Sequence, residues 1–350
     1  MERDILSVRQ MMVLLLVALL VPVTDLLPSV VAQRVGRGGW LVAPLALPAL
    51  LLALWLCSRV FCGRGLCVEV GKPVAYTILI IYIVWILLLL ALVFRFSAAR
   101  MGPIYRRVPP TFFAAGVAVL AVWMGRGKAA ALARAGEIFY LALAVVLVGV
   151  LLLAMLRVEW GNLYPVAWSK LPGGSISAAG ILLNVVPVAV LGARVPKSMR
   201  SARRVLGWAT VFCVTFLLVL VTVLGSVGSQ LCARLDTPYF IMVQGVGIKG
   251  AFQRLEAPMA ALWLLSDLIL SGMLLRAGND YVSSLVSERW GRRSVPILAL
   301  AAAAIGWLMF PEDDLLRVFG ADVLPVLGII LGLVIPVLLQ IVACVRKRNR

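Results

Sequence analysis

The sequence predicts an all-α integral membrane protein with about ten transmembrane helices. Of the 350 residues, 63% are hydrophobic, whereas a soluble domain contains about 45–50%. The mean hydropathy is +1.06, and the apolar residues form long runs close to the roughly 20 residues that cross a bilayer. No polar stretch is long enough to fold as a soluble domain. We therefore expect residues 1–350 to form a single transmembrane domain in the cell membrane, surrounded by lipid.

The expected spans follow one another with short connections. The runs that correspond to Thr111–Met124 and Pro296–Phe310 are short, so each is either a thin span or a re-entrant segment. An even number of spans places both termini on the same side of the membrane. In chain order, the runs are Met11–Ala32, Trp40–Val60, Val74–Phe96, Thr111–Met124, Glu137–Leu156, Ser175–Ala193, Val205–Val227, Ala251–Leu275, Pro296–Phe310 and Val323–Val345.

The net charge of +18 at first suggests a nucleic-acid partner. However, the Lys and Arg residues lie in short loops between apolar runs, where positive charge determines orientation. We therefore expect no nucleic-acid binding. Most of the 33 basic residues lie in the loops on the side of the termini, which predicts that both termini are cytoplasmic. The segment from Arg95 to Arg107 runs against this trend.

The residues that commonly hold metals and cofactors are scarce. The chain has no His, and Cys57, Cys62 and Cys67 repeat every five residues without a CxxC spacing. We expect reduced thiols, no metal site and no cofactor. Motifs typical of nucleotide-binding proteins, hydrolases and metalloproteases are also absent, so we expect no enzyme activity.

Two spans contain clusters of helix breakers. In the first, Pro22 and Pro28 flank Thr24 and Asp25; in the sixth, Gly180, Asn184 and Pro187 occur close together. These spans are five apart in a ten-span chain, and paired interruptions of this kind are typical of transporters built from inverted repeats. We expect repeats at about 9–156 and 175–345, with a binding site at the breaks. The alternative is two ordinary kinks, since Pro and Gly are frequent in membrane helices.

Asp25 is the first candidate for ligand contact. An ionisable group inside a bilayer is costly and is therefore a functional candidate. Two structural roles compete with ligand or ion binding. Asp25 either pairs with a nearby arginine or caps the N-terminus of a half-helix.

The eighth run carries the other charged candidates. At about 3.6 residues per turn, Trp263 and Asp267 follow Glu256 by nearly whole numbers of turns. These three side chains therefore share a face that turns away from lipid. Arg254 is close in sequence to Glu256 but points elsewhere, and we favour a structural role for the two over ligand contact.

These residues also carry a family resemblance. The stretch Pro238-Tyr239…Lys249-Gly-Ala-Phe-Gln-Arg254-Leu-Glu256…Trp263 resembles the permease-like B subunit of spore germinant receptors, a family in the amino acid–polyamine–organocation (APC) transporter superfamily. The most specific element is Arg-x-Glu followed seven residues later by Trp. Further agreement comes from Ser7-Val-Arg-Gln10, Gly127…Arg134, Pro196-Lys-Ser-Met-Arg200 and Pro311-Glu-Asp-Asp…Asp322.

The resemblance implies a LeuT-like fold of two inverted five-helix repeats, with broken first and sixth helices. It implies a location in the spore inner membrane and assembly with A and C subunits of a germinant receptor. It also implies that the protein senses a small nutrient, often an amino acid, rather than transporting it in bulk. An APC-type amino acid or cation transporter and a divergent structural subunit without a ligand are the alternatives.

The sequence departs from this family at the expected pocket. Many relatives have Gly-x-Gly near Val21 and Val23, and Gly-x-Glu near Val188 and Val190. Glycine allows a ligand to approach the bare backbone, so valine hinders the usual amino-acid pocket. We hypothesise a pocket for a cationic or amine-bearing ligand in which Thr24 and Asp25 form the polar part, with Gly180 and Asn184 opposite and Arg254 or Glu256 completing it. The roles expected for Pro22, Pro28, Pro187, Arg254, Trp263 and Asp267 are structural, and an Asp25–Arg254 pair would close the pocket.

Overall fold

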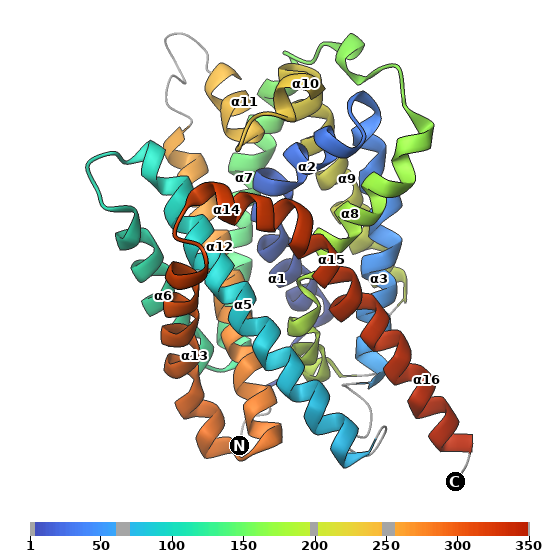
Figure 1. Ribbon diagram of the computed structural model, residues 1–350, viewed down its shortest axis with the longest axis vertical. Coiled ribbons are helices and arrows are strands. Elements are labelled where there is room, and N and C mark those ends of the chain that lie inside the picture. The colour runs from blue at the N-terminus through green and yellow to red at the C-terminus, as the bar shows by residue number, and fades with distance from the viewer. Residues whose placement is uncertain (1–3, 61–70, 197–201, 247–255, 349–350) are drawn as a thin grey trace.

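The computed structural model describes residues 4–60, 71–196, 202–246 and 256–348 (Figure 1). Arg254, Cys62, Cys67 and most of the motif that begins at Pro196 lie outside these residues. The cysteines that are described are free thiols. The described part of the chain is helical and contains no strand.

In the described residues of the first half, six α-helices accompany the π-helical segment η1 and the short 3₁₀ helix η2. Its elements are α1 (Val8–Val21), η1 (Pro22–Leu26), α2 (Leu27–Arg34), the 3₁₀ helix η2 (Arg37–Leu41), α3 (Val42–Val60), α5 (Lys72–Ile104), α6 (Pro110–Arg126) and α7 (Ala129–Met155). Two short 3₁₀ helices, η3 (Trp160–Leu163) and η4 (Trp168–Lys170), lead into the second half.

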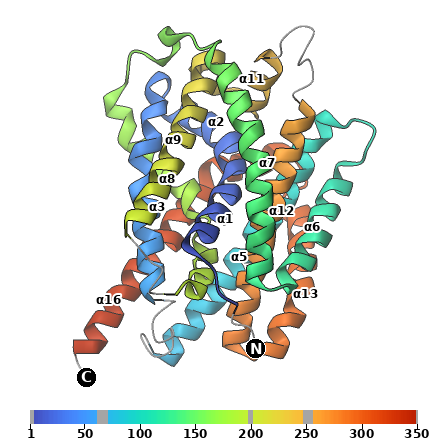
Figure 2. The same ribbon diagram turned by 180° about the vertical axis from the view of Figure 1, so that it is seen from behind.

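The second half begins with the interrupted sixth span. Its elements are α8 (Leu171–Leu183), the 3₁₀ helix η5 (Val186–Arg194), α9 (Ala202–Val227), α10 (Ser229–Cys232), α11 (Pro238–Val246), α12 (Glu256–Leu285), α13 (Glu288–Met309), α14 (Asp313–Val318), η7 (Phe319–Val323), α15 (Leu324–Ile329), η8 (Ile330–Val334) and α16 (Ile335–Arg348). The start of α1 and the end of α16 point toward the same end of the molecule (Figures 1 and 2).

The predicted all-α architecture of apolar spans is confirmed, with eight or nine spans in the described part of the chain where about ten are predicted. Among the described residues, eight helices are long and apolar enough to cross a membrane, and the bent pair that includes α8 and η5 makes nine. The shorter apolar helix α6 fits the remaining predicted span. Both runs that were short in sequence, in α6 and α13, belong to continuous helices rather than re-entrant loops, because their polar ends continue the helix.

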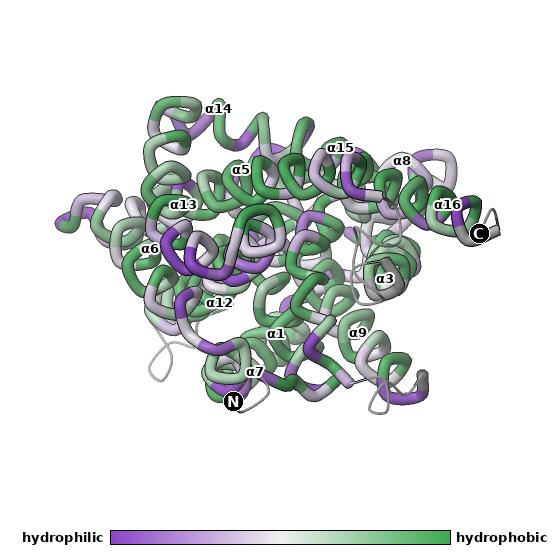
Figure 3. The backbone as a smooth tube through the Cα atoms, turned by 90° about the horizontal axis from the view of Figure 1, so that it is seen from below, coloured by the Kyte–Doolittle hydropathy of each residue, from purple (hydrophilic) through white to green (hydrophobic). Residues whose placement is uncertain are grey.

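The outer surface is apolar, as a lipid-facing surface must be. Large apolar side chains such as Trp123 (77% exposed) and Leu308 (81% exposed) point outward from α6 and α13. Figure 3 shows hydrophobic stretches along the helices on every side of the bundle. A soluble protein rarely exposes so continuous an apolar surface, so this surface faces the hydrocarbon of the bilayer.

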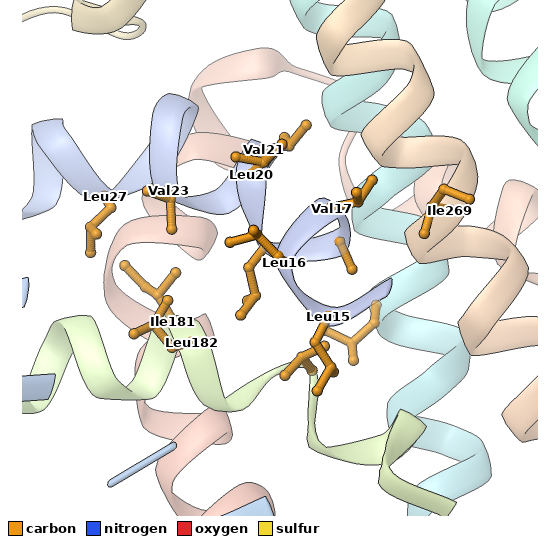
Figure 4. Close-up of a cluster of buried hydrophobic side chains, with 14 of the residues drawn as sticks. Leu15, Leu16, Val17, Leu20, Val21, Val23, Leu27, Ile181, Leu182 and Ile269 are labelled. Carbon is orange, nitrogen blue, oxygen red and sulfur yellow. The ribbon is translucent and has the colours of Figure 1, made fainter. Parts of the chain in front are cut away.

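The first span lies at the centre of the bundle. Most of α1 is buried, and it packs against α7 and α12. Its apolar side chains, including Leu16, Val17 and Leu20, meet Ile181 of α8 and Ile269 of α12 (Figure 4). Because α1 is apolar on all sides, it is suited to a position between helices rather than to one at the lipid surface.

The first span is interrupted where the sequence predicts. Pro22 and Pro28 lack the N–H groups that would bond to Ala18 and Thr24, so the regular α-helical ladder cannot continue through this region. The chain forms the π-helical turn η1 instead, in which the Leu27 N–H bonds to the Pro22 carbonyl.

The sixth span is broken more sharply. The axis bends by 50° between the helix that ends at Leu183 and η5. Pro187 lies in the first turn of η5, which continues as a 3₁₀ helix to Arg194. The Asn184 side-chain amide donates to the Gly180 carbonyl (2.8 Å), so one of the carbonyls left free at the break gains a partner.

Helix α5 corrects the sequence-based reading of the segment from Arg95 to Arg107. The helix continues to Ile104, so Arg95 and Arg100 lie inside a span rather than in a loop. Both are buried and ion-paired. Only Arg106 and Arg107 of this group lie in the following turn. This loop, on the side opposite the termini, therefore contains fewer basic residues than the sequence suggests, and it departs less from the positive-inside rule.

Candidate functional site

Three charged side chains meet at the centre of the bundle. Arg100 of α5 donates from Nη1 to Asp25 Oδ2 of η1 (2.9 Å) and from Nη2 to Asp267 Oδ2 of α12. Asp25 is 3% exposed, Arg100 4% and Asp267 1%. We call Asp25, Arg100 and Asp267 the central triad. It links the interrupted first span to two other spans through charge-assisted hydrogen bonds.

The break in the first span is also held by a polar contact with α12. The Trp263 indole donates from Nε1 to Thr24 Oγ1 (2.9 Å), and the Thr24 hydroxyl donates to the Leu20 carbonyl (2.7 Å). The Trp263 ring lies 5.8 Å from the Arg100 guanidinium carbon, within the range of a cation–π contact. Trp263 and Asp267 therefore share the inward face of α12, as the sequence predicts.

Asn184 and Gly180 hold the sixth span against the tenth. Besides Gly180, the Asn184 amide donates to the Leu324 carbonyl (3.2 Å), and its Oδ1 accepts from Trp85 Nε1 (3.3 Å). A Cβ atom on Gly180 would overlap the backbone of Pro325. Gly180 is therefore a point of close helix contact.

A cavity of about 80 Å³ adjoins the central triad. Its polar lining consists of the triad and Asn184. The apolar lining comes from the first, third, sixth, eighth and tenth spans and includes Val21. The other lining residues are Ala18, Leu19, Pro22, Leu26, Leu89, Leu92, Val93, Phe96, Ile181, Val185, Leu270, Leu274 and Leu324.

Two polar atoms of the triad have no hydrogen-bond partner among the described residues. They are Asp25 Oδ1, an acceptor, and Arg100 Nε, a donor. A buried polar group without a partner is costly. Both residues line the cavity, so these atoms retain hydrogen-bonding capacity that a small polar ligand or ordered water can use once it reaches them.

The structure separates the predicted site residues into three groups. Asp25 and Asn184 line the cavity, whereas Thr24 and Gly180 have structural contacts nearby. Pro28 is buried in α2, and the Pro187 carbonyl accepts from the Tyr281 hydroxyl (2.8 Å), which fits their structural roles. Glu256 is described only as the first residue of α12.

Among the described residues, the cation beside Asp25 is Arg100, whereas Arg254, which we hypothesised, lies outside those residues. Sequence reasoning missed Arg100 because it was assigned to a loop after an apolar run that ends at Phe96. The sequence did indicate that the helix continues past Arg100. Ser97, Ala98 and Ala99 do not form a turn, and Gly102-Pro103, a pair typical of helix ends, comes later. The structural alternative for Asp25, pairing with an arginine, is therefore observed.

A second group of charges lies at the end of the bundle that carries the termini. Arg194, the last residue of η5, donates to both oxygens of Asp280 in α12 (2.6 and 2.9 Å) and pairs with Asp4 (3.2 Å). Arg276 pairs with Asp4 (3.6 Å) and Asp280 (3.7 Å). These contacts tie the chain before α1 to the sixth and eighth spans and close this end of the bundle.

Asp4 predicts a pH dependence for this closure. Burial alone would raise the pKa of Asp4, but the N–H groups of Ala130 and Ala129, with Arg194 and Arg276, lower it below its usual 3.8. A lowered pKa in the folded state stabilises above the unfolded-state pKa, and this stabilisation is lost as pH falls through the folded-state pKa. Asp4→Asn should lower the free energy of unfolding near neutral pH by about 1 kcal/mol or less. In melting curves recorded at decreasing pH, the variant should lose less stability than the wild type below about pH 4. The same acid loss in the variant and the wild type would contradict this role.

Comparison with known proteins gives a structural match. No protein-family model matches the chain, and neither does any curated protein sequence. Among solved structures, the crystal structure of MhsT in complex with L-phenylalanine matches with a TM-score of 0.62 over 94% of this chain and 88% of MhsT. The chain has the LeuT-like fold. At 16% sequence identity, the match establishes the fold and not the ligand.

The LeuT-like fold accounts for the two interrupted spans and for the cavity between them. Two inverted five-helix repeats, with interruptions in the first and sixth spans, are the arrangement that the sequence predicts. In such folds, ligands bind where the interrupted helices meet. The cavity beside Asp25 and Asn184 is lined by residues of both interrupted spans.

Proposed function

We propose that the protein is a permease-like subunit of a nutrient germinant receptor. In this role it senses a small nutrient, often amino-acid-like, in the spore inner membrane, with both termini cytoplasmic and with A and C subunits as partners. The family resemblance of the Arg254–Trp263 region and the LeuT-like fold support this proposal.

One observation favours sensing over bulk transport. Transport in this class of fold requires one group of helices to rock against the rest around the site. Here Arg100 of α5 bridges Asp25 of the first span and Asp267 of α12 across the cavity. Breaking a buried ion pair is expensive, so the triad opposes repeated rocking and suits a protein that responds once to its ligand.

Deletion of the gene in its spore-forming host is expected to impair germination in response to at least one nutrient. Vegetative growth should be unchanged, because a sensor of this kind supplies no nutrient to the cell. The measurement is loss of spore refractility with single nutrients, beside growth on the same nutrients. A growth defect on an amino-acid source with normal germination would instead indicate a permease.

Complementation of the deletion with single variants tests whether Asp25 is needed for the response. Spores that carry Asp25→Asn at normal protein level should lose the response to the same nutrient, whereas Asp314→Asn, at an exposed position outside the cavity lining, should retain it. Loss of the Asp25→Asn protein itself would assign Asp25 to folding. A full response at normal protein level would exclude Asp25 from both roles.

An APC-type amino acid or cation transporter is the second candidate function. The charge cluster of Asp4, Arg194, Arg276 and Asp280 supports it, since partly exposed ion pairs at one end of the bundle can open and close. Flux of labelled substrates into proteoliposomes separates the candidates. A receptor subunit alone should show none.

A structural subunit without a ligand is the third candidate. Val23 and Val188, at positions where relatives have glycine, are fully buried and leave no open backbone at the two breaks. This candidate predicts that cavity substitutions alter protein level but leave the nutrient response of the accumulated protein unchanged.

A further inference from the structure

The charges around the central cavity do not balance. Its described lining contains two carboxylates, Asp25 and Asp267, and one guanidinium, Arg100. With all three ionised, the site carries one excess negative charge. In a low-dielectric interior, an uncompensated charge of this kind is strongly unfavourable, so the site favours the arrival of one positive charge.

The free acceptor shows where that charge would bind. Asp25 is 97% buried and lines the cavity, and its Oδ1 accepts no hydrogen bond within the described chain, while Oδ2 is taken by Arg100. Asp267 Oδ2 also accepts from Arg100. Of the triad's carboxylate oxygens, Asp25 Oδ1 of the interrupted first span is the one that is fully buried without a hydrogen-bond partner among the described residues.

The remaining lining indicates the kind of cation. Leu89, Leu92 and Phe96 of α5 and Leu270 of α12 provide apolar walls beside the triad. A bare metal cation requires several oxygen ligands, whereas an ammonium group needs few acceptors and brings an apolar portion that these walls would cover. A zwitterion adds no net charge and would bury a further carboxylate beside Asp25 and Asp267.

We propose that this cavity binds the ammonium group of a small cationic amine at Asp25 Oδ1, with its apolar portion against α5 and α12. The proposal rests on the proposed function as a ligand-binding module and names its ligand class as cationic rather than zwitterionic. The ammonium at Oδ1 shares the Asp25 carboxylate with Arg100, which donates to Oδ2, and the two positive charges repel each other. Binding therefore weakens the link between η1 and α5 and favours a different arrangement of the first span.

The test uses the purified full-length protein in lipid nanodiscs. Its melting temperature is titrated with L-alaninamide and with L-alanine at constant ionic strength and about pH 6, where the amino group of both is protonated. The two probes differ in one group, an amide in place of a carboxylate. Sodium chloride is titrated separately against N-methylglucamine chloride.

The expected result is a saturable rise in melting temperature with alaninamide and a response to alanine that is about tenfold weaker or less. Asp25→Asn should reduce the apparent affinity for alaninamide by about tenfold or more, while Asp314→Asn leaves it unchanged. Equal or tighter binding of alanine, a response to sodium alone, or unchanged binding by Asp25→Asn would overturn the proposal.

A second variant keeps the test decisive if Asp25→Asn does not fold. Val93→Phe retains the triad and places a larger side chain at the half-buried cavity wall. It should abolish the alaninamide response, and continued binding would contradict this site. Binding without a germination phenotype would reject the receptor role alone, and a germination phenotype without alaninamide binding would reject the cationic ligand alone.

Discussion

Replacing Arg100 with glutamine is expected to remove most of the folded protein from the membrane. Arg100 is the cation shared by Asp25 and Asp267, and all three side chains are buried. The variant would leave two carboxylates facing each other without a positive partner. Removing one member of a buried ion pair costs about 3–5 kcal/mol, a large fraction of the stability of an ordinary protein.

Protein level and melting temperature in detergent measure this effect. Arg106→Gln is the matched control, since Arg106 is exposed in the turn after α5 and should tolerate the same change. Adding Asp267→Asn to Arg100→Gln removes one of the stranded carboxylates and should restore part of the loss. Wild-type stability of Arg100→Gln, or no recovery in the double variant, would show that the triad does not hold the spans together.

Replacing Gly180 with alanine is expected to separate the sixth and tenth spans. A Cβ atom at Gly180 would overlap the Pro325 backbone, and one at Gly328 would overlap the Gly180 carbonyl. Neither neighbour is the end of a flexible side chain, so the helices α8 and α15 must move apart. Overpacking of this kind costs about 1–3 kcal/mol and sometimes more.

Gly149→Ala is the control for this substitution. Gly149 lies in α7 with no atom close to the position of a new Cβ, so alanine should be neutral or slightly stabilising there. The two variants are compared by melting temperature and by the alaninamide response. Gly180→Ala should lower the melting temperature clearly; a melting temperature equal to that of Gly149→Ala would show that the helix contact is not close.

The two predicted breaks differ in a way that local sequence does not reveal. Both contain proline, yet the first forms a π-helical turn whereas the sixth bends by 50°. Proline removes N–H groups in both places. How each span then continues depends on its neighbours, such as Trp263 beside Thr24 and Leu324 beside Asn184.

Hydropathy and helix breakers alone determined the class of the protein, the approximate number of spans and the positions of both interruptions. These features are local, because lipid requires every backbone polar group to be satisfied within its own segment. They also made Asp25 a candidate, since an acid within a span is costly wherever the chain folds.

Only the tertiary structure decided which charge meets Asp25. Arg100 and Asp267 are far from it in sequence, and Arg100 resembles a loop residue until α5 is seen to extend beyond it. The pairing of charges between helices depends on the packing and relative depth of three spans, which hydropathy does not specify. For this reason the excess negative charge beside the cavity follows from the assembled bundle and not from any one segment.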